Sequence, residues 1–190
     1  AVVYYHIYCD PRSYSNALAL FWGIMCLFWI YDLIVDYTPF ELNHKHQKLA
    51  VLLCFLPLAY PLFSAARGMH FPMMTSPVMP CSVAVFTIGL LLAFSRRVNL
   101  FLILFLCHWA LIGFTKTYFF QIPEDFLLAS SAVPGLYLFF KEYIAANLHT
   151  ATHLKARLIN ITLLVACGAI SLLFMISMVC ELAQDGDLSK

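Results

Sequence analysis

The sequence predicts an all-α integral membrane protein, a helical bundle with about six transmembrane helices and a short interfacial helix. Three observations predict this fold class. Of the 190 residues, 63% are hydrophobic and only 11% are charged, against roughly 25% charged residues in a typical soluble domain. The mean hydropathy is +0.84. The apolar residues also form continuous runs rather than an alternating pattern, which favours helices over strands.

This composition excludes a soluble globular enzyme, a nucleic-acid-binding protein and a disordered chain. The formal net charge of +1 provides no overall attraction to an acidic partner. No internal repeat or low-complexity segment divides the chain, so we expect a single domain over residues 1–190. No signal peptide pattern is present and the sequence begins at Ala1, so we expect the true start to be processed or to lie upstream.

Six apolar segments have about the length that a membrane-crossing helix needs, roughly 17–25 residues. They cover approximately residues 16–36, 48–66, 82–95, 99–119, 126–143 and 159–180. The second contains Pro57 and Pro61, the third is short, and the fifth contains Pro134-Gly135. We therefore predict six spans, of which the sixth has the cleanest apolar pattern.

The connections between these segments contain residues that are typical of helix ends. Tyr37-Thr38-Pro39 follows the first segment, the proline-containing stretch 67–80 follows the second, and Arg96-Arg97 forms a tight hairpin. Glu124 and Asp125 precede the fifth segment, where acidic side chains can cap a helix. Residues 147–157 are polar with a helical period, which predicts the interfacial helix.

The distribution of Lys and Arg predicts the orientation, because cytoplasmic loops carry more of them. The connections after the first, third and fifth segments contain seven: Lys45, Lys48, Arg96, Arg97, Lys141, Lys155 and Arg157. The other side contains four: Arg12, Arg67, Lys116 and Lys190. We expect a bacterial inner-membrane protein with the Arg96-Arg97 loop in the cytoplasm and both termini outside.

Asp32, Asp36 and His108 fall within predicted spans, where ionisable residues are costly and suggest function. Asp32 and Asp36 lie four residues apart near the end of the first span, so one helix face would carry both. They would bind a cation or a partner's arginine, or simply be hydrated at the interface. His108 lies mid-span, where it would be a haem ligand, a proton relay or a hydrogen-bond donor to a neighbouring helix. No second histidine lies at its depth on another span, so we expect no haem.

His149 and His153 are also four residues apart, and Arg157 extends the same helix face. This spacing can hold a metal ion, but the arginine would repel a cation and no third ligand is near in the sequence. We expect this face to contact lipid headgroups.

On the predicted outer side, loops carry His70, Cys81, Glu124 and Asp125, and His6 precedes the first span. Histidine, cysteine and carboxylate side chains together can bind a transition metal, so we name the first four as candidate metal ligands. The alternative is that they cap helices and pack loops. We name no catalytic residue and no cofactor other than structural lipids.

The seven cysteines are spread singly, without a CxxC pair. Cys9, Cys81 and Cys180 fall on the predicted outer side. One disulfide among them or three free thiols are both compatible with the sequence.

A series of short motifs resembles a family of bacterial polytopic membrane proteins known only as a domain of unknown function. The motifs, in chain order over residues 5–140, are Tyr5-His6, Tyr60-Pro61, Gly68, His70, Pro72, Pro80-Cys81, Phe86-Thr87-Ile88-Gly89-Leu90-Leu91, Trp109-Ala110-Leu111-Ile112-Gly113 and Pro123-Glu124-Asp125. Where the family usually has Cys-Pro-Thr-Thr, this chain has Cys81-Ser82-Val83-Ala84. The resemblance implies a shared fold and topology and no particular activity.

These observations favour a non-catalytic accessory or assembly subunit of a larger membrane complex. Its partners would be the lipid bilayer and other membrane subunits, contacted through helix faces where small residues allow close approach. The alternatives are a protein with a metal-binding or enzymatic site on its outer face, and a small transporter or channel that uses Asp32, Asp36 and His108.

Overall fold

The computed structural model describes residues 14–70, 76–94, 96–119, 123–147 and 154–187, and within these ranges the regular structure is helical, without an extended strand. The all-α prediction is therefore confirmed. The α-helices are α2 (Tyr14–Val35), α3 (Gln47–Phe55), α4 (Ala59–Ala66), α5 (Pro80–Phe94), α6 (Leu100–Phe119), α7 (Phe126–Ser130), α8 (Ala132–Asn147) and α9 (Leu154–Asp187). Three 3₁₀ turns join them: η1 (His44–His46), η2 (Leu56–Leu58) and η3 (Pro123–Asp125).

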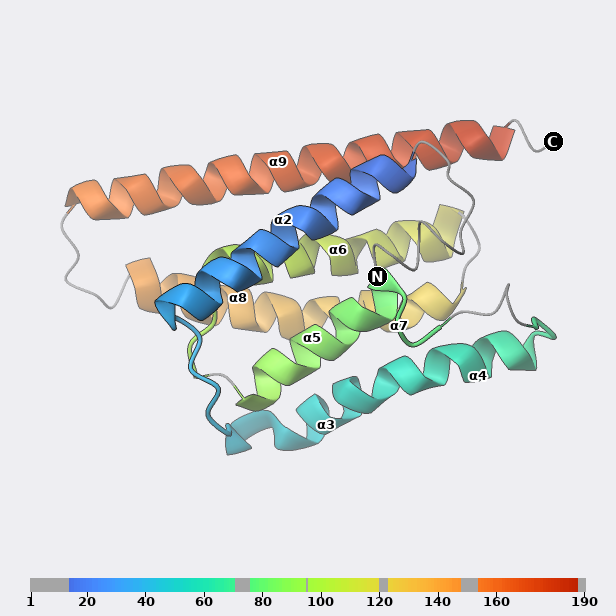
Figure 1. The fold of residues 1–190 in the computed structure, drawn as a ribbon, viewed down its shortest axis with the longest axis horizontal. Coiled ribbons are helices and arrows are strands. Elements are labelled where there is room, and N and C mark those ends of the chain that lie inside the picture. The colour runs from blue at the N-terminus through green and yellow to red at the C-terminus, as the bar shows by residue number, and fades with distance from the viewer. Residues whose placement is uncertain (1–13, 71–75, 95, 120–122, 148–153, 188–190) are drawn as a thin grey trace.

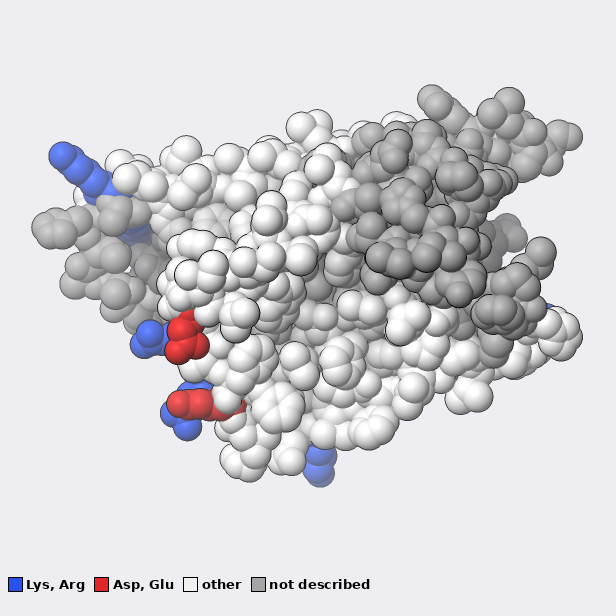
Figure 2. Space-filling model, in the orientation of Figure 1, with Lys and Arg blue, Asp and Glu red and all other residues white. Residues whose placement is uncertain are grey.

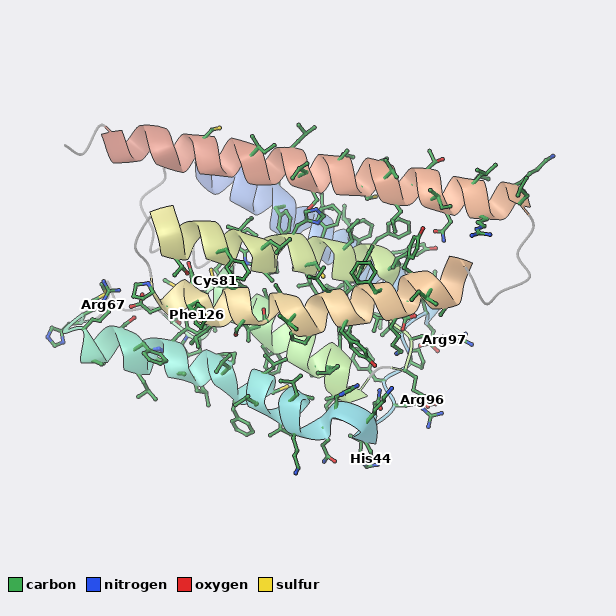
Figure 3. The ribbon with its side chains drawn as sticks, turned by 180° about the vertical axis from the view of Figure 1, so that it is seen from behind. His44, Arg67, Cys81, Arg96, Arg97 and Phe126 are labelled. Carbon is green, nitrogen blue, oxygen red and sulfur yellow. The ribbon has the colours of Figure 1, made fainter. Side chains whose placement is uncertain are left out.

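Successive helical segments run in alternating directions along the long axis of the molecule (Figure 1). The ends of α2, α5 and α8 consequently lie at one end of the bundle, together with the starts of α3, α6 and α9. We call it the basic end, because it holds Arg96 and Arg97. The opposite end holds Arg67 and Phe126 (Figure 3). This arrangement agrees with the order of segments predicted from hydropathy.

Two predicted segments are interrupted helices, and proline accounts for both interruptions. Pro57 has no backbone N–H to continue the α-helical ladder, and the chain tightens into η2 between α3 and α4. Pro134 lies just after the break between α7 and α8, where Ser131 donates its hydroxyl to the carbonyl of Leu128 at 2.6 Å. Each break is thus closed by local hydrogen bonds.

The centre of the bundle is α5, which packs against α3, α6, α7 and α8. Most of its side chains are buried, including Ile88 and Leu91 at 0% exposure. Two glycines permit the closest helix approaches. A Cβ on Gly89 would lie 2.8 Å from the Cβ of Leu53 in α3, and one on Gly113 of α6 would lie 2.7 Å from the backbone nitrogen of Ala129 in α7.

An aromatic cluster joins α2 to α6. The rings of Phe21 and Trp22 lie 5.1 and 5.4 Å from that of Trp109, and Phe21 lies 5.4 Å from Phe105. Such ring pairs contribute about 0.5–1.5 kcal/mol beyond their burial. This cluster holds the first helix against the core.

The longest helix, α9, lies at the periphery and packs on α2 and α6 (Figure 1). Most of its described side chains remain exposed, among them Val165 at 64% and Leu173 at 66%, whereas Ser171 is 1% exposed. The predicted sixth span is the middle of this 34-residue helix, and Arg157 lies in its first turns. The remainder of the predicted interfacial helix, including His149 and His153, lies outside the described residues.

By length and composition, one helical stretch among the described residues is long and apolar enough to cross a membrane: the 23 residues His44–Ala66, spanning α3, η2 and α4. Four apolar helices are shorter, namely Leu20–Val35, Pro80–Phe94, Leu100–Phe114 and Arg157–Leu173. The helical architecture is confirmed, and six transmembrane spans stay a prediction.

Candidate functional site

Buried polar residues gather at the basic end, where Asp32 meets Thr38 and Asn99. Their exposed fractions are 4%, 3% and 5%. The Thr38 hydroxyl and the Asn99 Nδ2 donate to Asp32 Oδ1 at 3.0 and 3.3 Å, and the Asn99 backbone N–H donates to Thr38 Oγ1 at 3.3 Å. One oxygen of the buried carboxylate therefore accepts two neutral donors, and these bonds join the end of α2 to the start of α6.

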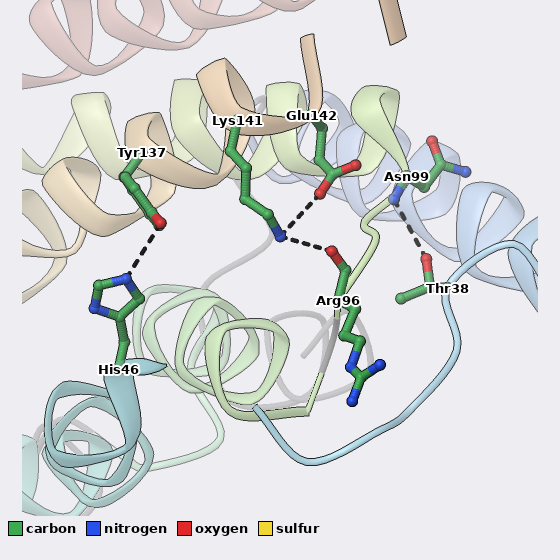
Figure 4. Close-up of polar contacts among 7 residues, drawn as sticks. All are labelled: Thr38, His46, Arg96, Asn99, Tyr137, Lys141 and Glu142. Atoms are coloured by element: carbon green, nitrogen blue, oxygen red, sulfur yellow. Dashed lines mark hydrogen bonds and ion pairs between the residues drawn. The ribbon is translucent and has the colours of Figure 1, made fainter. Parts of the chain in front are cut away.

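At the basic end, further contacts connect α8 to Arg96 and to η1 (Figure 4). Lys141 Nζ of α8 donates to the carbonyl of Arg96 at 2.6 Å and lies 3.2 Å from Glu142 Oε1. His46 Nε2 lies 3.2 Å from the Tyr137 hydroxyl. These bonds fix η1 and the Arg96 hairpin against α8.

The Tyr37 phenol reports the electrostatics of the basic end. Burial raises its pKa above the ordinary 10.0, the Glu142 carboxylate raises it further, Arg97 lowers it, and Asp32 raises it. The phenol is accordingly neutral at physiological pH, near two buried carboxylates.

Asp36 and His108, the other polar residues predicted to lie within spans, have different surroundings. Asp36 lies one residue beyond α2 with φ 52° and is exposed, so it does not continue the helix face of Asp32 as predicted. His108 is half-buried on α6, and its Nδ1 lies 2.8 Å from the carbonyl of Leu104 in the preceding turn. Asp32 is thus buried while Asp36 is exposed, so the two carboxylates have different surroundings.

At the opposite end, Arg67 and Glu124 form an ion pair between the end of α4 and η3. Arg67 Nη1 donates to Glu124 Oε1 at 2.8 Å and to Oε2 at 2.9 Å. The Arg67 side chain is 43% exposed and that of Glu124 is 2% exposed. The carboxylate is thus enclosed while part of the guanidinium faces outward.

A pocket of about 260 Å³ lies beside this ion pair. Its lining residues come from α4, η3 and α7: Phe63, Ala66, Arg67, Pro123, Glu124, Phe126 and Leu127. Apart from the ion pair, these side chains are apolar. Figure 3 shows Arg67 and Phe126 together at this end, far from Arg96 and Arg97.

The four candidate metal ligands have different surroundings in the structure. Glu124 pairs with Arg67, His70 is exposed, and Cys81 is buried in the first turn of α5. Asp125 is 5% exposed. In the part of the chain that the structure describes, no three His, Cys, Asp or Glu side chains form a group that could hold a metal ion.

The predicted outer-side cysteines can be followed only in part. Cys180 is a free thiol, and Cys9 and His6 lie outside the described residues. The disulfide prediction is accordingly untested where it involves Cys9.

The Arg67–Glu124 pair and the roles of Thr38 and Asn99 were not apparent from the sequence. The only signal was that each residue lies at the end of a predicted span, on the same predicted side as its partner. Pairing at the two ends follows from which helices are neighbours.

Comparison with known protein families gives a match over most of the chain. The model of a family of unknown function, DUF6064, matches residues 1–150. No curated protein and no solved structure is significantly similar to the chain. The matched region includes both polar sites and ends before α9.

Proposed function

The chain belongs to DUF6064, a family of unknown function, and from this premise we propose that it is a non-catalytic subunit of a larger membrane complex. In this proposal the bundle is embedded in a bacterial inner membrane through about six spans. Exposed helix faces, chiefly on α2 and α9, contact lipid and the helices of partner subunits.

The observation that supports this proposal best is the amount of exposed apolar surface. Leu33 and Ile34 of α2 are 82% and 77% exposed, and Leu62 of α4 is 70% exposed. Figure 2 shows charged side chains mainly at the basic end, with a wide uncharged surface along the side of the bundle. Soluble monomers rarely expose apolar patches this extensive, because water contact is unfavourable. A lipid or protein environment removes that cost.

The lengths of the helices are compatible with this arrangement. The four shorter apolar stretches, which are α5 and parts of α2, α6 and α9, have 15–17 residues each. They would reach about 22–26 Å, against a hydrocarbon thickness of about 30 Å. Flanking aromatic and basic residues or local thinning of the bilayer compensate for a mismatch of this size. The helix α5 contacts other helices on most sides and needs little direct contact with lipid.

The observed contacts give the alternatives less support. Among the residues proposed for ion transport, Asp32 is bonded to Thr38 and Asn99, and His108 is bonded within its own helix. Glu124, proposed for an outer-face metal or enzymatic site, is bonded to Arg67. These side chains contribute to the packing of the bundle, which is sufficient reason for their presence.

Photo-crosslinking in intact membranes tests the subunit proposal. A crosslinking amino acid replaces Leu173, which is exposed on α9, and a matched control replaces Leu102, which is 0% exposed on α6. We expect a discrete protein adduct from position 173 and none from position 102. Adducts with lipid alone, together with a bare monomer mass of 21.6 kDa after gentle extraction, would contradict a subunit role.

Cysteine labelling tests the membrane arrangement separately. In a cysteine-free background, Arg96→Cys and His70→Cys place single thiols at exposed positions outside the proposed spans, on opposite sides of the membrane in the proposed arrangement. An impermeant maleimide should label position 96 only in inverted vesicles and position 70 only in intact spheroplasts. Labelling of both from one side would refute the proposed arrangement.

A further inference from the structure

The pocket beside Arg67 and Glu124 has two unlike parts. Phe63 of α4 and Phe126 of α7 are 51% and 59% exposed, and with Leu127 they give it apolar walls. Its polar part is the ion pair. A ligand that suits both parts has an apolar chain and a polar head.

The charge of a suitable head group depends on which member of the ion pair is exposed to the pocket. Glu124 is 2% exposed, and both of its oxygens already accept from Arg67 Nη1. Arg67 is 43% exposed, so a ligand in the pocket meets the guanidinium rather than the carboxylate. Guanidinium groups bind phosphate through charge-assisted hydrogen bonds. The accessible charge therefore favours an anionic head.

We propose that this pocket binds an anionic phospholipid, with its phosphate on Arg67 and one acyl chain against Phe63, Phe126 and Leu127. Two residues that line the pocket, Arg67 and Phe126, lie at the end of the bundle (Figure 3), where the proposed membrane arrangement would place lipid headgroups. The ligand would connect α4 to α7, which belong to the two interrupted segments. Glu124 holds the guanidinium in position for the phosphate.

The first test compares single-chain probes. The full chain, purified in a neutral maltoside detergent, is titrated with dodecyl phosphate, dodecyltrimethylammonium or inorganic phosphate, and bound molecules are counted by native mass spectrometry. We expect one dodecyl phosphate per chain. It should bind about tenfold or more tightly than dodecyltrimethylammonium, which is the loss expected for one charge-assisted hydrogen bond. It should also bind more tightly than inorganic phosphate, which has no apolar chain to bury. Equal binding of the cationic probe would refute the role of Arg67, and equal binding of inorganic phosphate would refute the role of the apolar walls.

The second test locates the binding site. Ala66 lines the pocket and Ala65 does not, and both are exposed. Ala66→Trp fills the pocket without disturbing the core and should abolish dodecyl phosphate binding, whereas Ala65→Trp should bind like the unmodified chain. Equal binding by these two variants would place the ligand elsewhere and overturn the proposal.

A charge-neutral variant tests whether Arg67 recognises the charge of the ligand's head group, without unfolding the chain. Arg67→Gln combined with Glu124→Gln retains a hydrogen-bonding pair without leaving a buried charge unpaired. We expect this variant to lose its preference for the phosphate probe over the cationic probe, and a retained preference would refute the assignment to Arg67. This result does not depend on whether α2 and α9 contact partner helices. The proposed lipid site can therefore be refuted while the proposed subunit function stands.

Discussion

Replacing Gly113 by alanine probes the closest approach between α6 and the segment that carries Glu124. The added Cβ would lie 2.7 Å from the Ala129 backbone nitrogen and 2.8 Å from the Asp125 carbonyl oxygen, where ordinary contacts begin at 3.4 Å. Both neighbours are backbone atoms, so no side-chain rotation relieves the overlap. The segment η3–α7 must move away from α6 by several tenths of an ångström.

The magnitude follows from two opposing terms. Overpacking a close-packed contact costs about 1–3 kcal/mol, and a contact with backbone belongs at the upper end of this range. Alanine recovers roughly 1 kcal/mol through its higher helix propensity. We therefore expect a net loss of about 2 kcal/mol in the free energy of unfolding. Gly23→Ala is the matched control, because nothing lies within 4 Å of its added Cβ, and it should stabilise the chain by up to about 1 kcal/mol.

The assay is reversible unfolding in mixed micelles with increasing sodium dodecyl sulfate, followed by the emission of the three tryptophans. Both variants retain every tryptophan, so their transitions can be compared directly. If Gly113→Ala is as stable as Gly23→Ala, then α7 does not pack on α6 as closely as described. The pocket geometry at Glu124 would then be wrong as well.

Three further predictions concern the polar sites. Arg67→Gln should lower the free energy of unfolding by about 2–3 kcal/mol in the same assay, less than for a fully buried pair because Arg67 is 43% exposed. Adding Glu124→Gln should restore most of this loss. A double variant that is no more stable than Arg67→Gln alone would contradict the ion pair. Thr38→Val removes a hydroxyl that donates one buried hydrogen bond and accepts another, so we expect a loss of about 1–3 kcal/mol, whereas Thr38→Ser should be nearly neutral. Burial and the Glu142 charge raise the pKa of Tyr37. The chain has ten tyrosines, so the Tyr37 signal is taken as the ultraviolet titration difference between a chain and its Tyr37→Phe variant. In the Glu142→Gln background this pKa should be lower than in the unmodified chain, and an unchanged pKa would contradict the influence of Glu142 on Tyr37. Because the folded chain holds this proton more tightly than the unfolded one, the contribution of Tyr37 to stability should be full below pH 10 and decline as the pH rises above it.

The helices could be predicted from the sequence because hydropathy and proline act locally. The first predicted segment, 16–36, corresponds to α2 at Tyr14–Val35, and the fourth, 99–119, to α6 at Leu100–Phe119. Prolines marked the interrupted second and fifth segments, although their consequences for the hydrogen-bond ladder required coordinates. Whether these helices cross a membrane depends on their surroundings, which helix geometry alone does not determine.

The candidate sites could be predicted only as single residues. Asp32 was identified because a carboxylate in an apolar segment is costly, but its partner Asn99 is 67 residues away. Arg67 and Glu124 are separated by 57 residues and meet because α4 and η3 lie side by side. Pairings of this kind follow from helix packing, which periodicity does not specify. The expected group of four metal ligands assumed that separate loops meet in space, which periodicity does not specify either.

Because α5 lies at the centre of the bundle and α9 at its periphery, the two helices should tolerate substitutions differently during evolution. Nearly every substitution in α5 changes a contact with another helix, so its residues should vary little and in step with those of α3. Substitutions on the outer side of α9 alter only what surrounds the bundle, and they can follow a change of partner or lipid without disturbing the core. Within DUF6064, we therefore expect the interior to preserve the fold while the outermost helix, which lies beyond the matched residues 1–150, diversifies.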